Sequence, residues 1–400
     1  MSGEFGNMRI ISFLAMLFLG AAALAQIPPL VMPQGVGVNI HFTTGHERDL
    51  DMIRDGGFKF VRMDFSWEAT EKSPGKYDFS EYDELMRHLK ERGIRTMFIL
   101  DYSHPAYEKD GASPRHAESV AAFAKWSAAA AKHFANDHVI WEIFNEPNGG
   151  FWHPKPDAHE YTPLALATAK AIREAEPNAT IVAPALSEMD WDFLKVFLSS
   201  AILQYLDGVT VHPYRDGSQA PETAAPDYAK LRAWIDREAP PEKKGRIPII
   251  SGEWGYSSNT KGVSLEQQAQ YAVRQQLFNF ANGIPLSIWY DWKNDGPDPN
   301  DNESNFGTVT ENLEPKPAYL AIQKMTHELD GYEFQYSRRS YTNDFIYEFR
   351  DAVYVYSKPR ASKTIAWTIV AAHTTTIEGG FEEPSRVITI ENAPIYLPSP

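Results

Sequence analysis

Residues 141–148 read WEIFNEPN, a short apolar run that stops at an Asn-Glu pair and is closed by proline. Proline cannot donate to a neighbouring strand, so this stretch predicts a buried β-strand that ends at Glu146 and turns into a loop. A second stretch, residues 249–255, reads IISGEWG and ends in Glu253 beside a tryptophan. We therefore expect both glutamates at the carboxyl ends of strands.

Short apolar runs of this kind alternate with longer segments of helical period between residues 35 and 330. The alternation is typical of the βα units of a parallel sheet. Helical segments include 82–92, 120–134 and 266–281, several of which end near glycine. Eight strands are expected, at residues 36–42, 58–65, 95–102, 139–146, 180–185, 208–214, 247–254 and 286–291.

Eight βα units predict an α/β fold, a closed (β/α)8 TIM barrel, and no Gly-rich phosphate loop follows the first strand. Glu146 and Glu253 would close the fourth and seventh strands and face each other across the barrel mouth. Because the active site of such a barrel is built at the carboxyl ends of its strands, polar residues there become the candidates. They are Asn39, His41, Arg62, Asp64, Asp101, His104, Asn145, Glu146, His212, Tyr214, Glu253, Trp289 and Asp291.

The pattern of apolar and polar residues changes after about residue 331. Alternating segments at 345–349, 352–356, 364–370 and 386–391 indicate strands, and no helical period remains. We expect residues 26–330 to form the catalytic barrel and residues 331–400 to form a small accessory β-sandwich-like domain. Irregular strands that merely cap the barrel are the alternative.

The N-terminus has the pattern of a secretory signal. Met8-Arg9 precede an apolar run from residue 10 to 23 and an A-x-A cleavage site at 23–25. Residues 1–25 are thus expected to be a signal peptide, with residues 1–7 an expression-vector remnant or an upstream start. The protein would be secreted or periplasmic, without stable membrane insertion once the signal is removed. A membrane anchor is the alternative, although the run is short for a span.

The amino-acid composition limits the classes of molecule that the protein is expected to bind. Lys and Arg total 38 against 53 Asp and Glu, a net charge of -15, so a nucleic acid would be repelled. Aromatic residues are abundant, with 10 Trp, 19 Tyr and 22 Phe, which suits stacking on sugar rings. There is no cysteine, which excludes a disulfide scaffold, thiol chemistry and cysteine metal sites. We expect no metal and no cofactor, and the oligomeric state is left open.

Two carboxyl groups across a barrel mouth suit glycoside hydrolysis. One acid protonates the leaving oxygen while the other carboxylate attacks, and in retaining enzymes the two groups lie about 5–5.5 Å apart. Arg62 could keep Glu253 ionised, and the ionised Glu253 together with partial burial would raise the pKa of Glu146. Three alternatives stay open. Asn-Glu-Pro is common where a strand turns into a loop. Arg62 could be a structural ion-pair partner of Asp64 or of a neighbouring carboxylate, and Glu253 could be a solvated loop acid.

At this point the chain resembles the clan A glycoside hydrolases, and within the clan it is most similar to family 39. The resemblance covers roughly residues 35–330. It rests on WEIFNEPN at 141–148, VHPY at 211–214, GEWG at 252–255, FW at 151–152 and KPAY at 316–319. One departure is Phe144, which stands where many relatives carry tryptophan.

The resemblance implies roles for individual residues. Glu146 would be the acid/base and Glu253 the nucleophile, held by Arg62. Asn145 would bond the sugar 2-hydroxyl in the −1 subsite, with Tyr214 beside the nucleophile and His212 lining the same subsite. Trp289 would form a stacking floor and His104 a further contact. The substrate-binding candidates that complete the set are His41 and Trp152. Structural histidines at 104 and 212, and a core position for Trp289, are the alternatives.

The sequence therefore predicts a retaining glycosidase that cleaves β-type O-glycosidic bonds in an oligo- or polysaccharide through a covalent glycosyl-enzyme. An open-cleft endo-glycanase of another clan A family is the main alternative. A non-catalytic carbohydrate-binding barrel would have lost one of the two glutamates. A metal-dependent hydrolase would need His-x-His on the first strand, where the chain has Asn39-Ile40-His41. The sugar, its linkage and the choice between exo and endo action stay open.

Overall fold

The computed structural model describes residues 27–339, 345–351, 365–370, 375–378, 387–390 and 395–397. The predicted signal peptide at 1–25 and the strand expected at 352–356 lie outside these residues.

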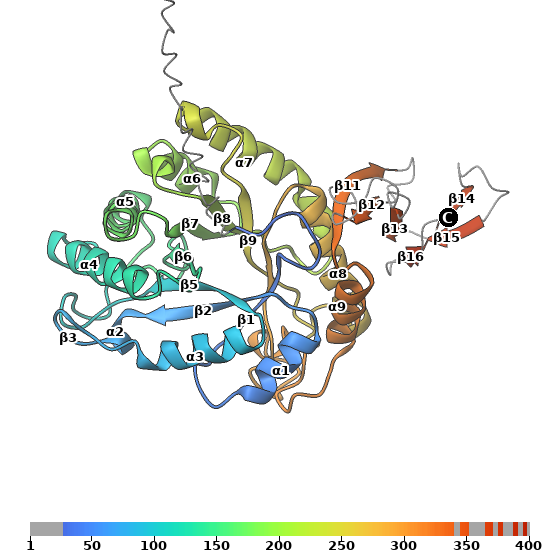
Figure 1. The fold of residues 1–400 in the computed structure, drawn as a ribbon, viewed down its shortest axis with the longest axis horizontal. Helices are drawn as coiled ribbons and strands as arrows, with labels where there is room; N and C mark the ends of the chain where they lie inside the picture. Colours follow the sequence, from blue (N-terminus) through green and yellow to red (C-terminus); the bar gives the residue numbers. More distant parts are fainter. Residues whose placement is uncertain are drawn as a thin grey trace, which may run out of the picture.

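Eight parallel strands close into a barrel in the order β1-β10-β9-β8-β7-β6-β5-β2 (Figure 1). The predicted (β/α)8 barrel is confirmed, and every expected strand overlaps an observed one. The barrel strands are β1 (Val36–Asn39), β2 (Phe60–Ser66), β5 (Arg95–Asp101), β6 (Ile140–Ile143), β7 (Thr180–Ser187), β8 (Gly208–His212), β9 (Ile249–Trp254) and β10 (Ser287–Trp289).

Helices surround the barrel, and Figure 1 shows them on its outside. In α3 the buried side chains Tyr82, Leu85, Met86 and Leu89 recur at helical spacing, so one face packs on the strands. The α-helices are α1 (Glu47–Asp55), α2 (Trp67–Thr70), α3 (Ser80–Glu91), α4 (Ala117–His133), α5 (Ala158–Ala175), α6 (Trp191–Leu198), α7 (Ala225–Glu238), α8 (Leu265–Ala281) and α9 (Pro317–Glu328). A hairpin of β3 (Glu71–Ser73) and β4 (Lys76–Tyr77) follows α2.

After α9 the described chain contains strands only, as the sequence predicts. β11 (Tyr332–Arg339), β12 (Phe345–Asp351), β13 (Ile365–Val370) and β16 (Ile395–Leu397) form a four-stranded sheet. β14 (Thr375–Glu378) and β15 (Val387–Ile390) form a separate pair. The division into a barrel at 26–330 and an independent domain at 331–400 stays a prediction.

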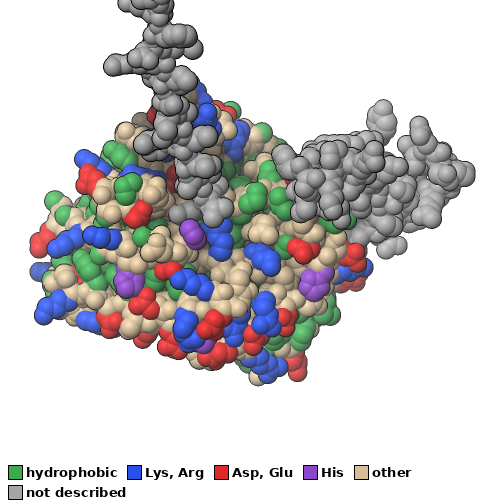
Figure 2. Space-filling model, in the orientation of Figure 1, with side chains coloured by type: hydrophobic (Ala, Val, Ile, Leu, Met, Phe, Trp, Pro, Cys, Tyr) green, Lys and Arg blue, Asp and Glu red, His purple; other side chains and the backbone are tan. Residues whose placement is uncertain are grey.

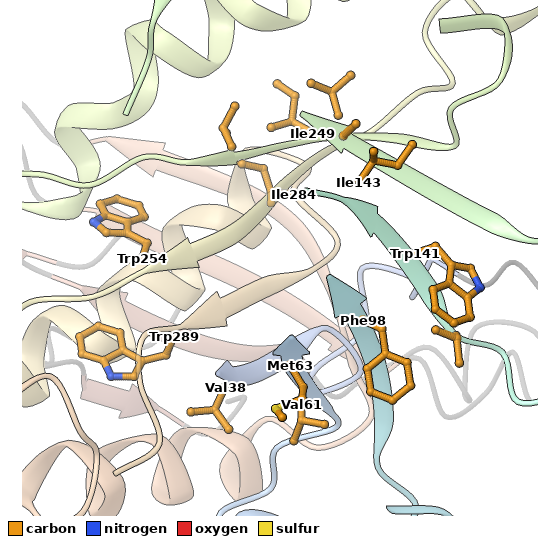
Figure 3. Close-up of a cluster of buried hydrophobic side chains, with 14 of the residues drawn as sticks. Val38, Val61, Met63, Phe98, Trp141, Ile143, Ile249, Trp254, Ile284 and Trp289 are labelled. Atoms are coloured by element: carbon orange, nitrogen blue, oxygen red, sulfur yellow. The ribbon is translucent and has the colours of Figure 1, made fainter. Parts of the chain in front are cut away.

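The core has two layers that determine where polar groups can lie. The larger layer packs between strands and helices and includes Trp141, Trp254 and Trp289 (Figure 3). A smaller layer fills the barrel, formed by Phe60, Met97, Ile140, Val182, Ile250, Leu286 and Ile288. Since side chains alternate along a strand, Arg62 and Glu142 are the next residues after Phe60 and Ile140 on the side that faces the interior. The apolar plug thus forms a floor, and the polar residues lie on the mouth side of it.

The surface seen in Figure 2 mixes Lys and Arg with Asp and Glu, without a large area of one sign. Among the helices that the structure describes, none has the length and apolarity needed to cross a bilayer.

Candidate active site

Arg62 is the centre of the polar cluster on the mouth side of the barrel plug. Its side chain is buried, with 1 % of its surface exposed. Nε donates to Glu142 at 2.7 Å, Nη1 donates to Asn39 at 3.1 Å and to Glu253 at 2.5 Å, and Nη2 contacts Asn145 at 2.7 Å and His212 at 3.3 Å. A guanidinium has five N–H donors, so each one has a partner. Arg62 does not hydrogen-bond Asp64, but it does pair with a neighbouring carboxylate, Glu142, so the expected structural ion pair is present together with the contact to Glu253.

This use of every donor fixes the orientation of the neighbours. Arginine cannot accept a hydrogen bond, so Nε2 of His212 accepts from Arg62 and the ring proton lies on Nδ1. Nδ1 is 3.0 Å from Oε1 of Glu146 and therefore donates to it. Burial lowers the pKa of His212 to about 4, so the ring is neutral at neutral pH. In the same way Oδ1 of Asn145 faces Arg62, which leaves its amide N–H groups directed elsewhere.

Glu253 accepts two strong hydrogen bonds, one on each carboxylate oxygen. Oε2 bonds Arg62, and Oε1 accepts from the hydroxyl of Tyr214 at 2.7 Å. Burial and the charge of Glu253 raise the pKa of Tyr214 well above its ordinary value, so the phenol keeps the proton that it donates. The side chain of Glu253 is 12 % exposed, which rules out the solvated loop acid. The two donors hold the carboxylate of Glu253 in a fixed orientation.

Glu146 is about as exposed as Glu253, at 14 % against 12 %, but it has fewer charged partners. Burial raises its pKa, partly offset by a side-chain hydrogen bond with Ser187 and by the charge of Arg62. Burial, rather than the expected charge of Glu253, is therefore the leading cause of the shift. The backbone here is unusual, with φ of 44° at Glu146 and 67° at Phe144, a region that costs non-glycine residues about 1–3 kcal/mol. The Glu146 N–H donates to Ala185 on β7 at 3.0 Å and holds this turn in place.

The two acids are close enough to act on one bond. Oxygens of Glu146 and Glu253 lie within 4.8 Å of each other and of a ring nitrogen of His212. This spacing fits the retaining geometry of about 5–5.5 Å and not the inverting one of about 6.5–9.5 Å. The same three side chains could in principle ligate a metal. However, the guanidinium of Arg62 already occupies Glu253 and His212, and its positive charge opposes a cation there.

Glu142 is the functional neighbour that sequence reasoning missed. It is 0 % exposed, and its Oε2 accepts from Arg62 at 2.7 Å. Gly252 explains how it fits, because a Cβ there would lie 2.9 Å from Oε1 of Glu142. An acid in the middle of an otherwise apolar strand was the available signal, since a buried charge needs a partner.

Comparison with known proteins identifies the family to which the chain belongs. The sequence model of one family, described as cellulase (glycosyl hydrolase family 5), matches residues 32–296, which is most of the barrel. The chain belongs to glycosyl hydrolase family 5. The sequence predicted membership in clan A from the residues at the ends of the fourth and seventh strands, and the family match confirms it. This family 5 member is a retaining glycoside hydrolase. No curated protein matches the chain.

Solved structures similar to this family 5 member include family 39 enzymes, in line with the resemblance seen in its motifs. A family 39 glycoside hydrolase from the gut symbiont Bacteroides cellulosilyticus WH2 has a TM-score of 0.78 at 22 % identity, with 94 % of this chain and 82 % of that chain covered. A monomeric β-xylosidase from Caulobacter crescentus CB15 has 0.62 at 17 %, with 87 % and 76 % covered. A glucosidase from Croceicoccus marinus has 0.66 at 15 %, with 92 % and 83 % covered. At these identities the likeness shows the shared barrel fold.

Two tryptophans expected at the site of this hydrolase belong to the core instead. Trp289 is 0 % exposed and lies beside Trp254 on the outer side of the sheet (Figure 3). Trp152 is 1 % exposed, and its Nε1 donates to Glu160 at 3.3 Å. Neither can form a stacking surface for a sugar.

In both places the adjacent aromatic residue takes the accessible position. Tyr290 follows Trp289 and is partly exposed, and its pKa is raised by burial and by the charges of Asp291 and Glu253. Phe151 precedes Trp152, is 44 % exposed and stacks on Tyr102 with ring centres 5.4 Å apart. Tyr102 in turn contacts Phe144, two residues before the acid Glu146. Tyr290 and Phe151 thus replace Trp289 and Trp152 as the aromatic candidates.

His104 is a structural histidine, which corrects its expected contact with substrate. The backbone N–H of Ala106 donates to its Nδ1 at 3.1 Å, so the ring proton lies on Nε2 and is donated to the carbonyl of Glu71 at 2.8 Å. The ring is buried at 5 % exposure against Trp67. Neither nitrogen is left to meet a sugar.

His41 lies at the rim of the cluster, as the sequence suggested. Its side chain is 42 % exposed, 3.7 Å from Asp291, and packs edge-on to Tyr290 at 5.8 Å. Asn39 connects it to the centre, since its amide group contacts His41 at 3.3 Å while its oxygen accepts from Arg62. The structure therefore brings together Arg62, Asn145, Glu146, His212, Tyr214 and Glu253, with His41 at their edge.

Proposed function

We propose that Glu253 is the nucleophile and Glu146 the acid/base of this retaining glycoside hydrolase, acting on β-linked oligo- or polysaccharides. One observation carries the assignment. The two carboxyl groups lie within 4.8 Å of each other, yet only Glu253 has a charged donor on one oxygen and a phenol on the other. The acid with donors is suited to attack, and the buried acid with a raised pKa is suited to carry a proton.

In the first step Glu253 attacks the anomeric carbon while Glu146 gives its proton to the leaving oxygen. A bond forms between a Glu253 oxygen and C1, and the bond from C1 to the leaving oxygen breaks. His212 donates to Oε1 of Glu146, so the transferable proton is carried by Oε2. In the second step the Glu146 carboxylate takes a proton from water, which displaces Glu253 from C1 and restores both groups.

Arg62 would hold the side chains of the site in their positions during both steps. When Glu253 becomes an ester its negative charge is lost, and the guanidinium still has Glu142 as a buried counter-charge. Asn145 turns its oxygen to Arg62 and its amide group also interacts with the hydroxyl of Tyr102, which leaves one amide N–H to donate to the sugar 2-hydroxyl. Bonds of that kind that tighten in the transition state raise the rate.

The aromatic residues suggest where the two halves of the substrate lie. Tyr290, beside Glu253, would form the floor under the sugar that is attacked. Phe151, which follows Glu146 by five residues on the same loop, would stack on the leaving half. Similar structures include a β-xylosidase and a glucosidase, so β-xylosides and β-glucosides are the first substrates to test.

The test is a panel of nitrophenyl β-glycosides and β-linked polysaccharides, with the anomer of the first product followed by NMR. Retention with at least one β-glycoside is expected. An initially inverted product would contradict the double displacement, and hydrolysis only of α-glycosides would contradict the substrate class.

We further propose that the protein is exported by the predicted signal at residues 1–25, because a basic start, an apolar run and an A-x-A site occur in order. Expression of the full chain with N-terminal sequencing of the extracytoplasmic fraction tests this. The mature protein should begin at Gln26, and an uncleaved chain in the cytoplasm would contradict export.

A further inference from the structure

The wall of the barrel mouth between β2 and β5 carries two aspartates that the double displacement does not use. Asp64 follows Arg62 by two residues on β2, so the two side chains point to the same side of the strand. Asp101 ends β5, and the register pairs Asp64 with Ile99. Asp101 is therefore the diagonal neighbour of Asp64 on the inner face.

Asp101 is a buried acid without an ordinary donor. It is 0 % exposed, and neither carboxyl oxygen has a hydrogen-bond donor among the residues that the structure describes. Its side chain contacts that of Asp64, and burial followed by the charge of Asp64 raises its pKa well above the ordinary value. Two acids in contact relieve their repulsion by sharing one proton. Asp101 then donates this proton to Asp64.

The shared proton leaves Asp64 with a free acceptor that faces the mouth. Asp64 is partly exposed, whereas Asp101 is not. Arg62 cannot neutralise this acceptor by a hydrogen bond, because its N–H groups all bond other residues. A carboxylate in such a position is a strong acceptor for a hydroxyl group.

The order of strands around the barrel indicates which hydroxyl Asp64 would meet. C1 must lie between Glu253 on β9 and Glu146 after β6, and the 2-hydroxyl lies near Asn145 after β6. β5 and then β2 follow β6 around the barrel. C3 and C4 follow C2 around the sugar ring in the same way, so they pass the wall formed by Asp101 and Asp64.

We infer that Asp64, positioned by Asp101, binds a glycone hydroxyl beyond C2, at C3 or C4, and so selects the sugar in the −1 subsite. The inference rests on the proposed function of Glu146 and Glu253. It assigns substrate selection to a pair of groups that takes no part in breaking the bond.

The experiment is a cycle of variants against substrates, using the nitrophenyl glycoside on which the wild-type enzyme is most active and its 3-deoxy and 4-deoxy analogues. Asp64→Ala should lower kcat/KM for the parent glycoside about 10- to 100-fold, as expected for a lost hydrogen bond to a charged group. On one of the two deoxy analogues the same variant should change kcat/KM less than about threefold, because the hydroxyl is already missing. Asp83→Asn, an exposed acid on α3, is the matched control and should leave both values unchanged.

Asp101 has its own test. Asp101→Asn supplies an amide N–H in place of the shared proton, so its kcat/KM should stay within about threefold of the wild-type value. Asp101→Ala supplies no donor, so it should raise KM and lower kcat/KM by the factor seen for Asp64→Ala. Equal losses by Asp64→Ala on the parent and both deoxy glycosides would overturn the inference. Melting temperatures of all variants separate unfolding from lost binding. If the wild-type enzyme turned over no glycoside, the proposed function itself would fail.

Discussion

The surroundings of Glu253 and of Glu146 differ more than the two side chains do. Glu253 lies at the end of a regular strand and receives a guanidinium N–H and a phenol O–H. Glu146 lies in a turn with positive φ, faces a neutral imidazole and has its pKa raised by burial. The side chains of Glu253 and Glu146 are 12 % and 14 % exposed, so their hydrogen-bond partners, rather than their access to solvent, distinguish them. In the proposed mechanism, the donors on neighbouring strands thus give two identical residues opposite tasks.

The largest expected effect is that of replacing Glu253, the acid that accepts hydrogen bonds on both carboxylate oxygens. Glu253→Gln removes the nucleophile and leaves Arg62 without one of its two counter-charges, so kcat should fall by at least about 10⁴-fold. Steady-state assay on the best nitrophenyl glycoside measures this, with Glu91→Gln on α3 as the exposed control. Near wild-type turnover by the Gln variant would remove Glu253 from the mechanism.

Glu146→Ala should have an effect that depends on the leaving group. A general acid contributes about 10²- to 10⁴-fold, and a loss of that size is expected for alkyl glycosides and oligosaccharides. Dinitrophenyl glycosides need no proton on the leaving oxygen, so their first step should be spared. A plot of log kcat/KM against leaving-group pKa should become steeper in the variant. An unchanged slope would mean that another group supplies the proton.

The pH profile sharpens the contrast between the two acids. Glu146 must be protonated for the first step, so kcat/KM falls about tenfold per pH unit as pH rises above its pKa. Because burial raises that pKa, activity should extend above the ordinary carboxyl range. In Glu146→Ala, measured on the dinitrophenyl glycoside, this basic limb should disappear. Its persistence would assign the limb to a different residue.

The same comparison shows what sequence can and cannot provide. The apolar runs predicted the ends of the strands, and this was enough to bring Arg62, Asn145, His212 and Tyr214 to the two glutamates. Along β10 the alternation of side chains places Tyr290 on the inner face with Leu286 and Ile288 and leaves Trp289 on the outer face. Trp289 was expected at the site from the resemblance, and this alternation was the signal in the sequence that contradicts it.

Irregular loops explain the other errors. Residues 147–154 have neither a strand nor a helical period, so nothing in the sequence says that Trp152 turns into the core while Phe151 stays exposed. His104 was placed at the mouth because it follows a strand, but its hydrogen bonds go to Glu71 and Ala106, contacts that only the fold creates. Strand ends could be predicted because their pattern is local, whereas these positions depend on distant partners.

The smallest expected effect tests the leaving-group side next to Glu146. Phe151→Ala removes an exposed ring that stacks on Tyr102, and a stacked aromatic contact contributes about 0.5–1.5 kcal/mol, or two- to tenfold in kcat/KM. The loss should be found with aryl or oligosaccharide leaving groups and not with methyl glycosides, which have nothing to stack. Leu320→Ala, at an apolar residue on α9 that is also exposed, is the control and should change neither. An equal loss on methyl glycosides would mean that Phe151 supports the turn that holds Glu146, and the contrast between the two acids would then extend to the loops that carry them.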